Sequence, residues 1–185
     1  MAQHSLTYLC IILCAAQVAP LPISCRIHGG LIQNIQSLLE KMGGLFPLEC
    51  LDHNARFTFP VSSFKSNTTA QVDTGVERAV YATLVNIDVL YENDTMPTNW
   101  DQVELDIFRN LVYRVVEESE CVLKKSQTVQ EDTFSDSEAA LEEYFGEMTN
   151  FLEEKEYSVC AWEVVRKETL HALRFILHDV SDPWA

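Results

Sequence analysis

Basic residues are scarce in this chain, which has 13 Lys and Arg against 28 Asp and Glu among 185 residues and a formal net charge of −15. Clustered Lys and Arg supply most of the affinity for nucleic acids and anionic membranes, so neither is an expected partner. Glycine and proline are also few, with six of each, which argues against a fibrous or loop-dominated chain. Because 47% of the residues are hydrophobic and only 22% are charged, a mainly disordered chain is excluded, and the length indicates one domain.

The motifs of common enzyme classes are missing as well. The chain has no Walker loop and no GxGxxG, HExxH or GxSxG pattern, and none of its cysteines lies in a CxxC pair or a Cys/His cluster. His171 and His178 could share one helix face, but no further His lies near them, so a solvated pair is preferred over metal ligands. We therefore predict no catalytic residue, no metal site and no cofactor.

The first 24 residues contain no Asp, Glu, Lys or Arg. Residues 6–16 form an apolar run that is shorter than the about 20 residues needed to span a bilayer. We predict a secretory signal peptide that is cleaved between Ala16 and Ser24, and a mature domain of residues 25–185 that is secreted without membrane insertion. The alternative is an apolar N-terminal core helix.

Secretion would place the cysteines in an oxidising compartment. Four cysteines remain after the predicted signal peptide: Cys25, Cys50, Cys121 and Cys160. An even number predicts two disulfides, with buried free thiols as the alternative, but three pairings are possible and the spacing does not choose between them. Asn67 and Asn93 each begin an Asn-X-Thr sequon in a polar connecting stretch, so both are predicted glycosylation sites, although sequons also occur by chance.

Apolar residues at helical spacing predict five amphipathic helices and therefore an all-α bundle. The predicted core stripes are, in chain order, Ile27, Leu31, Ile35, Leu38 and Met42; Val72, Val76, Ala79, Thr83, Ile87 and Leu90; Val103, Ile107, Leu111 and Val115; Leu141, Phe145, Met148 and Leu152; and Trp162, Val165, Thr169, Ala172 and Ile176.

The boundaries of these helices are also suggested by local patterns. Gly43-Gly44 ends the first helix, and capping-box spacing begins the third at Thr98 and the fourth at Ser135. Residues 45–69 have no sustained period and form a long first connection, and residues 122–134 are polar and aperiodic.

The last predicted helix carries three of the 13 basic residues outside its core stripe. Arg166, Lys167 and Arg174 lie within about 100° of one another around the helix axis. A local positive face on an acidic protein can orient an acidic partner. Glu163 dilutes this face, and a merely solvated surface is the alternative.

Two blocks of the sequence resemble vertebrate type I interferons. Cys160–Glu168 reads CAWEVVRKE and closely resembles the family signature CAWEVVR. Cys50-Leu51, followed by Phe57-Thr58-Phe59-Pro60, is similar to the Cys-Leu and Phe-Gly-Phe-Pro blocks of the family's first long loop. The four mature cysteines match those of alpha-type members. The resemblance covers about residues 25–178 and suggests a fish-type, four-cysteine member.

This resemblance implies a helical cytokine fold with two defined disulfides. In the family the first cysteine pairs with the third and the second with the fourth, which corresponds to Cys25–Cys121 and Cys50–Cys160. The second pair would attach the long connection to the last helix. Each disulfide would close a loop of roughly 100 residues, worth about 4–5 kcal/mol of chain entropy.

The resemblance also implies a function. A monomeric interferon bridges two class II cytokine receptor chains, the type I interferon receptor, on opposite faces and triggers antiviral JAK-STAT signalling. The positions that match the family's high-affinity receptor surface are Arg166, Lys167, Leu170, His171 and Arg174, with Asn54 and Arg56 from the loop.

Two features of these positions stay open. Asn54 occupies the place of the family's critical loop arginine, so either Arg56 replaces that anchor or the anchor is absent. Arg166 either contacts the receptor or braces the long connection internally, whereas Trp162 is expected in the core. The alternatives to an interferon are another helical cytokine with a different receptor pair and a secreted helical enzyme or carrier, which would need a deep pocket with converging polar groups.

Overall fold

The computed structural model describes residues 25–65, 72–126 and 132–180, and within them the fold is all-helical, as predicted. The predicted signal peptide, residues 1–24, and the sequon at Asn67 lie outside the described residues. The elements are α2 (Gly29–Gly43), η1 (Leu48–His53), η2 (Val61–Phe64), α3 (Val72–Tyr91), α4 (Gln102–Ser119), α5 (Cys121–Ser126), α6 (Asp132–Glu154) and α7 (Val159–His178), where η marks a short 3-10 helix.

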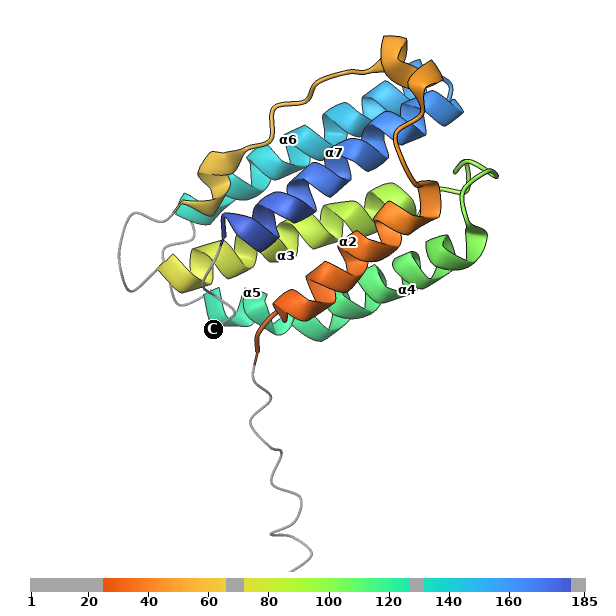
Figure 1. Cartoon of the computed structure of the whole chain (residues 1–185). Helices are drawn as coiled ribbons and strands as arrows, with labels where there is room; N and C mark the ends of the chain where they lie inside the picture. Colours follow the sequence, from red (N-terminus) through yellow and green to blue (C-terminus); the bar gives the residue numbers. More distant parts are fainter. Residues whose placement is uncertain (1–24, 66–71, 127–131, 181–185) are drawn as a thin grey trace, which may run out of the picture.

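The five predicted helices form one bundle, and α5 is an additional short helix (Figure 1). Helix α2 packs against α4 and α7, and α3 packs against α4 and α6. Helix α5 extends the chain after α4 and packs against α3. Five of its six residues lie in the stretch 122–134 that we expected to be aperiodic, because one and a half turns are too short to show an amphipathic repeat.

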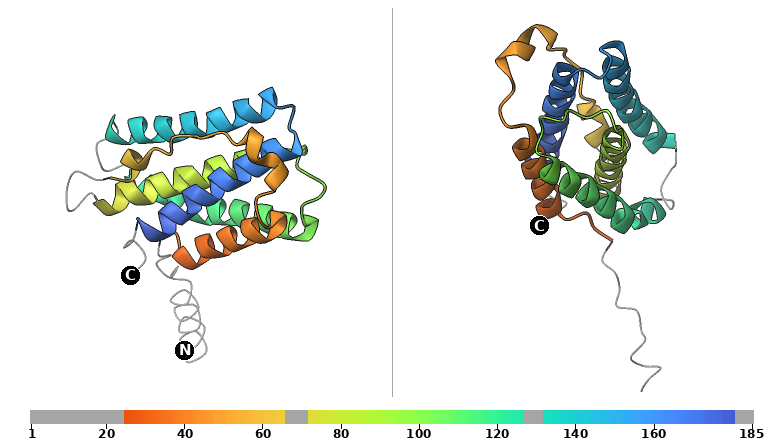
Figure 2. Two further views of the ribbon diagram at one scale, coloured as in Figure 1. Left: turned by 45° about the horizontal axis from the view of Figure 1, so that its top comes forward. Right: turned by 90° about the vertical axis from the view of Figure 1, so that its right-hand side faces the viewer.

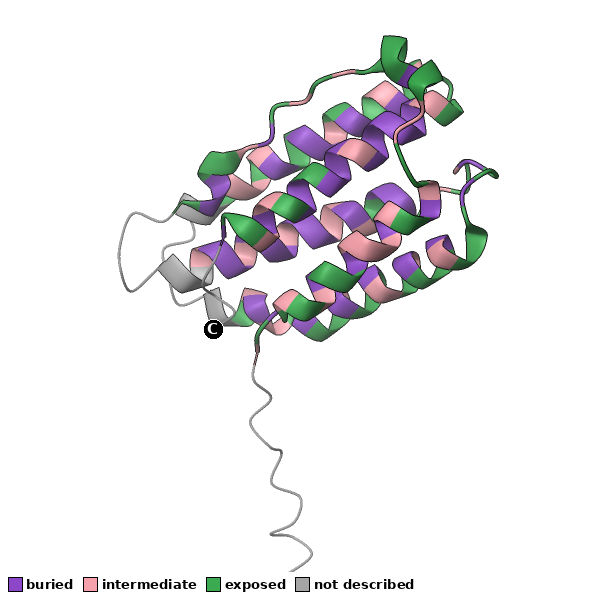
Figure 3. Cartoon of the chain, viewed as in Figure 1, coloured by how far each residue is buried: buried purple, intermediate pink, exposed green. Residues whose placement is uncertain are grey.

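Helix α7 is buried on almost every side, which makes it the central helix of the bundle. All five predicted core residues, Trp162 among them, are fully buried. Seven further α7 residues are buried too, including Glu163 and Arg166. Only four residues of α7 are exposed, three of them in its C-terminal half (Figure 3).

Helix α4 presents a different face to the core than the one predicted. Leu105, Phe108, Val112 and Val115 are buried, whereas Val103 and Ile107 are 68% and 48% exposed. The predicted core residues are four apart, which is more than one helical turn of 3.6 residues, so the row drifts around the helix. Its first two members, Val103 and Ile107, therefore face solvent. The N-cap is Asp101 rather than Thr98, and its carboxylate accepts from the N–H groups of Val103 and Glu104.

Two other predicted helix ends are tested by the structure. Helix α2 ends at Gly43, and Gly44 has φ 63°, a conformation that favours glycine, with its N–H donating to the Glu40 carbonyl. That stop was predicted. Helix α6 already begins at Asp132, so Ser135 lies inside the helix and the predicted cap there was wrong.

The long connection after α2 runs over the surface of α6 and α7 (Figures 1 and 2). Its first half contains η1, which packs against α7, and its second half contains η2, which packs against α3 and α6. Phe59 anchors it, because its ring meets those of Tyr144 on α6 and Phe175 on α7 with centroid distances of 5.2 Å each. An aperiodic segment is thus held by aromatic contacts to residues far along the chain.

No helix within the described residues is long and apolar enough to cross a membrane.

Candidate functional site

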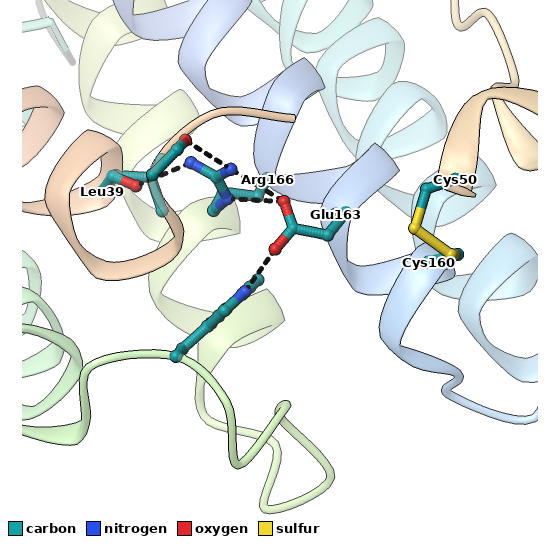
Figure 4. A network of polar contacts seen from close by, with 7 residues as sticks. Leu39, Cys50, Cys160, Glu163 and Arg166 are labelled. Carbon is teal, nitrogen blue, oxygen red and sulfur yellow. Dashed lines mark hydrogen bonds and ion pairs between the residues drawn. A yellow bond between two sulfur atoms is a disulfide. The ribbon is translucent and has the colours of Figure 1, made fainter. Parts of the chain in front are cut away.

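Two disulfides hold the bundle, and they are the pairs that the resemblance implied. Cys25 is bonded to Cys121, and Cys50 is bonded to Cys160. The second bond joins η1 to the first turn of α7, so the long connection and the last helix form one continuous surface (Figure 4). This surface, made by the end of α2, residues 44–59 and α7, is called the strap surface below.

Beneath the strap surface lies a buried ion pair between Glu163 and Arg166. The Arg166 Nη2 and a Glu163 carboxylate oxygen are 2.7 Å apart, and the two side chains are only 3% and 1% exposed. The other Glu163 oxygen accepts a hydrogen bond of 2.6 Å from the indole Nε1 of Trp100. Arg166 also donates to the backbone carbonyls of Leu39 and Gly44, at 3.2 and 2.9 Å (Figure 4).

Arg166 is therefore an internal brace, which was one of the two possibilities left open by the sequence. Its guanidinium reaches from α7 to the end of α2 and is engaged in hydrogen bonds there, so the structure favours the brace over a direct receptor contact. Leu170 is also largely covered, at 7% exposed, although it lines the hollow described below, so its receptor contact stays a prediction. Helical spacing alone predicted that the side of α7 bearing Arg166 and Leu170 faces solvent. In the structure, α2 and the residues after it pack over that side.

The remaining predicted residues do lie at the surface. Lys167 is partly exposed, and His171, Arg174, Asn54 and Arg56 are exposed. The Lys167 ammonium donates to the Asn54 side chain across 113 residues of sequence, and it lies 3.0 Å from a Glu168 carboxylate oxygen. The loop position that departs from the family arginine is thus joined directly to α7.

Arg174 forms a second link between α7 and α2. Its Nη2 lies 2.8 Å from a Glu40 carboxylate oxygen. Two hydrogen bonds lower the pKa of Glu40, the larger effect coming from Arg174 and the smaller from Gln36. Burial of the carboxylate raises the pKa, but by less than the hydrogen bonds lower it. Both side chains are about half exposed, so the pair orients two helices at the surface and contributes little stability.

A hollow of about 470 Å³ opens between these residues, and both apolar and charged side chains line it. Leu45 and Phe46 line it together with the cationic Lys167 and Arg174. Leu45, Leu48 and Leu51 are 94%, 80% and 55% exposed. Solvent-facing leucines next to cations are typical of a protein-binding surface. Leu45 and Leu48 were not predicted as binding residues. The sequence signal for them was the presence of large apolar side chains in an aperiodic stretch beside Pro47.

A second exposed surface lies on α3 and α4, where Val89, Val103, Ile107 and Tyr113 are 48% to 68% exposed. We call it the α3–α4 surface. Helix α4 lies across the bundle from η1 and η2 of the long connection, while its N-terminal end adjoins the end of α2, where the Asp101 N–H donates to the Met42 carbonyl (Figure 2). Between the two helices is a hollow of about 310 Å³ that includes Asp88 and Arg109. Burial, and then the carboxylates of Glu92 and Glu117, raise the pKa of Asp88 above its usual range, with Arg109 opposing them.

The sequon at Asn93 lies in the connection between α3 and α4. The Asn93 side-chain oxygen accepts from the N–H and the hydroxyl of Thr95, at 2.8 and 2.6 Å. This compact turn is partly exposed, and its glycosylation stays a prediction. No group of His, Cys, Asp or Glu within the described ranges is arranged to hold a metal ion.

Comparisons with known proteins agree with the residue blocks noted in the sequence. Residues 27–179 match the family model of the interferon alpha/beta domain. Horse (Equus caballus) interferon alpha-1 is 32% identical over 137 residues, which is 73% of each chain, and human (Homo sapiens) interferon alpha-10 is 30% identical over 75% of this chain and 73% of that protein. The solved structure of zebrafish interferon 2 has a TM-score of 0.75 and 40% identity, covering 82% of this chain and 98% of that one.

Proposed function

The chain belongs to the type I interferon family of cytokines, with fish-type members among its structural relatives, and from this premise we propose that it is secreted and bridges two different class II cytokine receptor chains. The family consists of cytokines rather than enzymes. Bridging would bring the receptor-associated kinases together and start antiviral JAK-STAT signalling. The ligand would act as a monomer whose only task is to hold two binding surfaces in a fixed relation.

The strap surface is the proposed site for the high-affinity receptor chain, and its geometry is the observation that carries the proposal. Five residues implied by the family resemblance are accessible there: Asn54, Arg56, Lys167, His171 and Arg174. The exposed Leu45 of the long connection lines the same hollow as Lys167 and Arg174. A receptor with acidic groups around an apolar centre would complement this surface.

The α3–α4 surface is the proposed site for the second receptor chain. Val103 and Ile107 are four residues apart on α4 and therefore point the same way, and both are exposed. Because α4 lies across the bundle from η1 and η2, we expect receptors on the two surfaces to leave room for each other (Figure 2). This separation is what supports bridging over binding to one receptor alone.

The test is to apply the purified, secreted protein to cells of the matching species. Induction of interferon-stimulated genes is expected, and it should disappear when either receptor chain is deleted. Induction that survives deletion of both chains would favour the other helical cytokine class with a different receptor pair. Direct binding of each isolated receptor ectodomain, measured by surface plasmon resonance, assigns the two surfaces.

A further inference from the structure

The buried pair Glu163–Arg166 is placed to control the shape of the strap surface from below. Arg166 makes two hydrogen bonds to Glu163, of 3.0 and 2.7 Å, and one each to the Leu39 and Gly44 carbonyls. Glu163 in turn accepts a hydrogen bond from Trp100, which lies near the end of the connection between α3 and α4. Three segments that are distant in sequence therefore meet at one salt bridge.

The guanidinium serves as the cap for the end of α2. Carbonyl groups in the last turn of a helix lack partners within the helix and carry a partial negative charge. Arg166 supplies a positive charge at that point and donates to the carbonyl of the C-cap residue Gly44, immediately before Leu45 and Phe46, and it also donates to the Leu39 carbonyl one turn earlier. An apolar side chain of the same volume could fill the space but would leave the Gly44 carbonyl without this donor.

Gly43 shows how closely the brace and α2 fit together. A Cβ atom at this position would lie 2.5 Å from Arg166 Nε and 2.7 Å from Cζ, so a side chain there would displace the guanidinium. Because four hydrogen bonds fix that guanidinium, it cannot move without breaking them. Gly30, in the same helix, has no heavy atom within 4 Å of the corresponding Cβ position.

We propose that Glu163 and Arg166 are positioning residues for receptor binding: they touch no receptor, and they fix the path of residues 44–48 so that Leu45 and Phe46 meet it correctly. The inference rests on the proposed function of the strap surface. Substitution of Arg166 is thus expected to change receptor binding only indirectly, through the position of residues 44–48. Leu45 is 94% exposed, so only its backbone and its neighbours hold it in place.

The main experiment compares Gly43→Ala with Gly30→Ala. Both changes add a methyl group and favour the helix, but only the first displaces Arg166. Gly43→Ala is expected to weaken binding of the high-affinity receptor ectodomain about tenfold, equivalent to about 1.4 kcal/mol. It should also speed hydrogen exchange at residues 44–48, while Gly30→Ala changes neither quantity. Equal binding by the two variants would overturn the inference.

A double-mutant cycle separates positioning from general destabilisation. Leu45→Ala is expected to weaken receptor binding in the natural background and to cost much less in the Gly43→Ala background, because the segment is already misplaced there. Additive losses would reject action through Leu45. Should Gly43→Ala not fold, Arg166→Lys replaces it in the same cycle, since Lys keeps the charge but cannot make the same forked contacts.

Failure of this inference can be distinguished from failure of the proposed function. Lys167→Gln alters the exposed part of the strap surface and leaves the brace intact. If Lys167→Gln weakens receptor binding and Gly43→Ala does not, the surface is correct and the positioning role is wrong. If neither Lys167→Gln nor Leu45→Ala affects binding, the strap surface itself is wrongly assigned and both proposals fall.

Discussion

At the scale of single residues, Lys167 is where the strap surface can be tested with little disturbance of the fold. Its ammonium contacts the Asn54 side chain and lies 5.9 Å from the centre of the Phe46 ring. Loss of the charge in Lys167→Gln is expected to reduce the affinity for the high-affinity receptor about three- to tenfold, mainly through slower association at low salt. Surface plasmon resonance at several salt concentrations measures this.

The control for that prediction is Arg114→Gln on α4, which changes the net charge equally. Arg114 is 59% exposed and pairs with Glu118 within its own helix. Its loss should leave the association rate with the high-affinity receptor unchanged. An equal slowing by both variants would mean that overall charge, rather than the strap surface, governs association.

Asp88 gives a prediction about pH. Because burial and two acidic neighbours raise its pKa above the usual 3.8, the folded chain binds this proton more tightly than the unfolded chain does. The charged carboxylate therefore lowers stability at neutral pH, and the deficit vanishes as the pH falls below 3.8. Because Asp88 is only partly buried, solvent screens these interactions, and Asp88→Asn should raise the free energy of unfolding at pH 7 by no more than a few tenths of a kcal/mol.

Thermal melts at pH 7 and at about pH 3 check the sign of this effect. The gain should be present at the higher pH and absent at the lower one. The exposed Asp106 on α4 provides the matched control, since Asp106→Asn removes a carboxylate without relieving burial. A gain from Asp88→Asn that is the same at both pH values would show that charge is not its cause.

At the scale of elements, the two disulfides allow stability and receptor binding to be separated. They span 96 and 110 residues, so each is worth a similar chain entropy, about 4–5 kcal/mol at most. Replacing Cys50 and Cys160 together by Ser should lower stability, free η1 and weaken receptor binding. The matching Cys25/Cys121 double variant should lose comparable stability but keep its affinity at temperatures where it is folded.

Urea denaturation, together with receptor titration at 10 °C, measures both quantities. Equal affinity losses in the two double variants would mean that binding depends only on overall stability, and that attachment of the long connection to α7 has no specific role.

Helices were predictable from this sequence where one face alone is buried. The stripe of α6, from Leu141 to Leu152, is an example, because each of its predicted members is buried. The prediction failed where a distant segment covers a helix. On α7, Arg166 and Leu170 point toward α2 and the chain that follows it, and no periodicity within α7 records that neighbour. The opposite error occurred on α4, where Val103 and Ile107 were assigned to the core on spacing alone.

The candidate site was predictable in its covalent and motif-bearing parts and less so in its apolar parts. The family blocks indicated the disulfide pairs and the cations of α7. Leu45 and Leu48 belong to no periodic pattern, so their exposure could not be predicted from the sequence. Their positions depend on the attachment of η1 to α7 by the Cys50–Cys160 disulfide. Contacts made by an irregular segment depend on long-range packing that local patterns do not encode.

At the scale of the whole molecule, the proposed function requires two surfaces that act independently. The strap surface lies on the end of α2, residues 44–59 and α7, and the α3–α4 surface lies on the side of the bundle away from η1 and η2 (Figure 2). A rigid body between them would keep the two receptors at a fixed distance, and α7, buried on nearly every side, supplies that rigidity. Damage to one surface should therefore leave the other functional.

The double variant Val103→Glu/Ile107→Glu tests this independence. Both side chains are exposed, so the substitutions should hardly change the melting temperature, but two carboxylates would disrupt an apolar contact with the second receptor. The variant is expected to bind the high-affinity receptor normally, to induce interferon-stimulated genes at least about tenfold less and to compete with the natural protein as an antagonist. Lys167→Gln should show the reverse pattern, with weak binding of the first receptor and no antagonism. Full signalling by the double variant would show that the second receptor binds elsewhere, whereas loss of both receptors together would mean that the two surfaces are not independent.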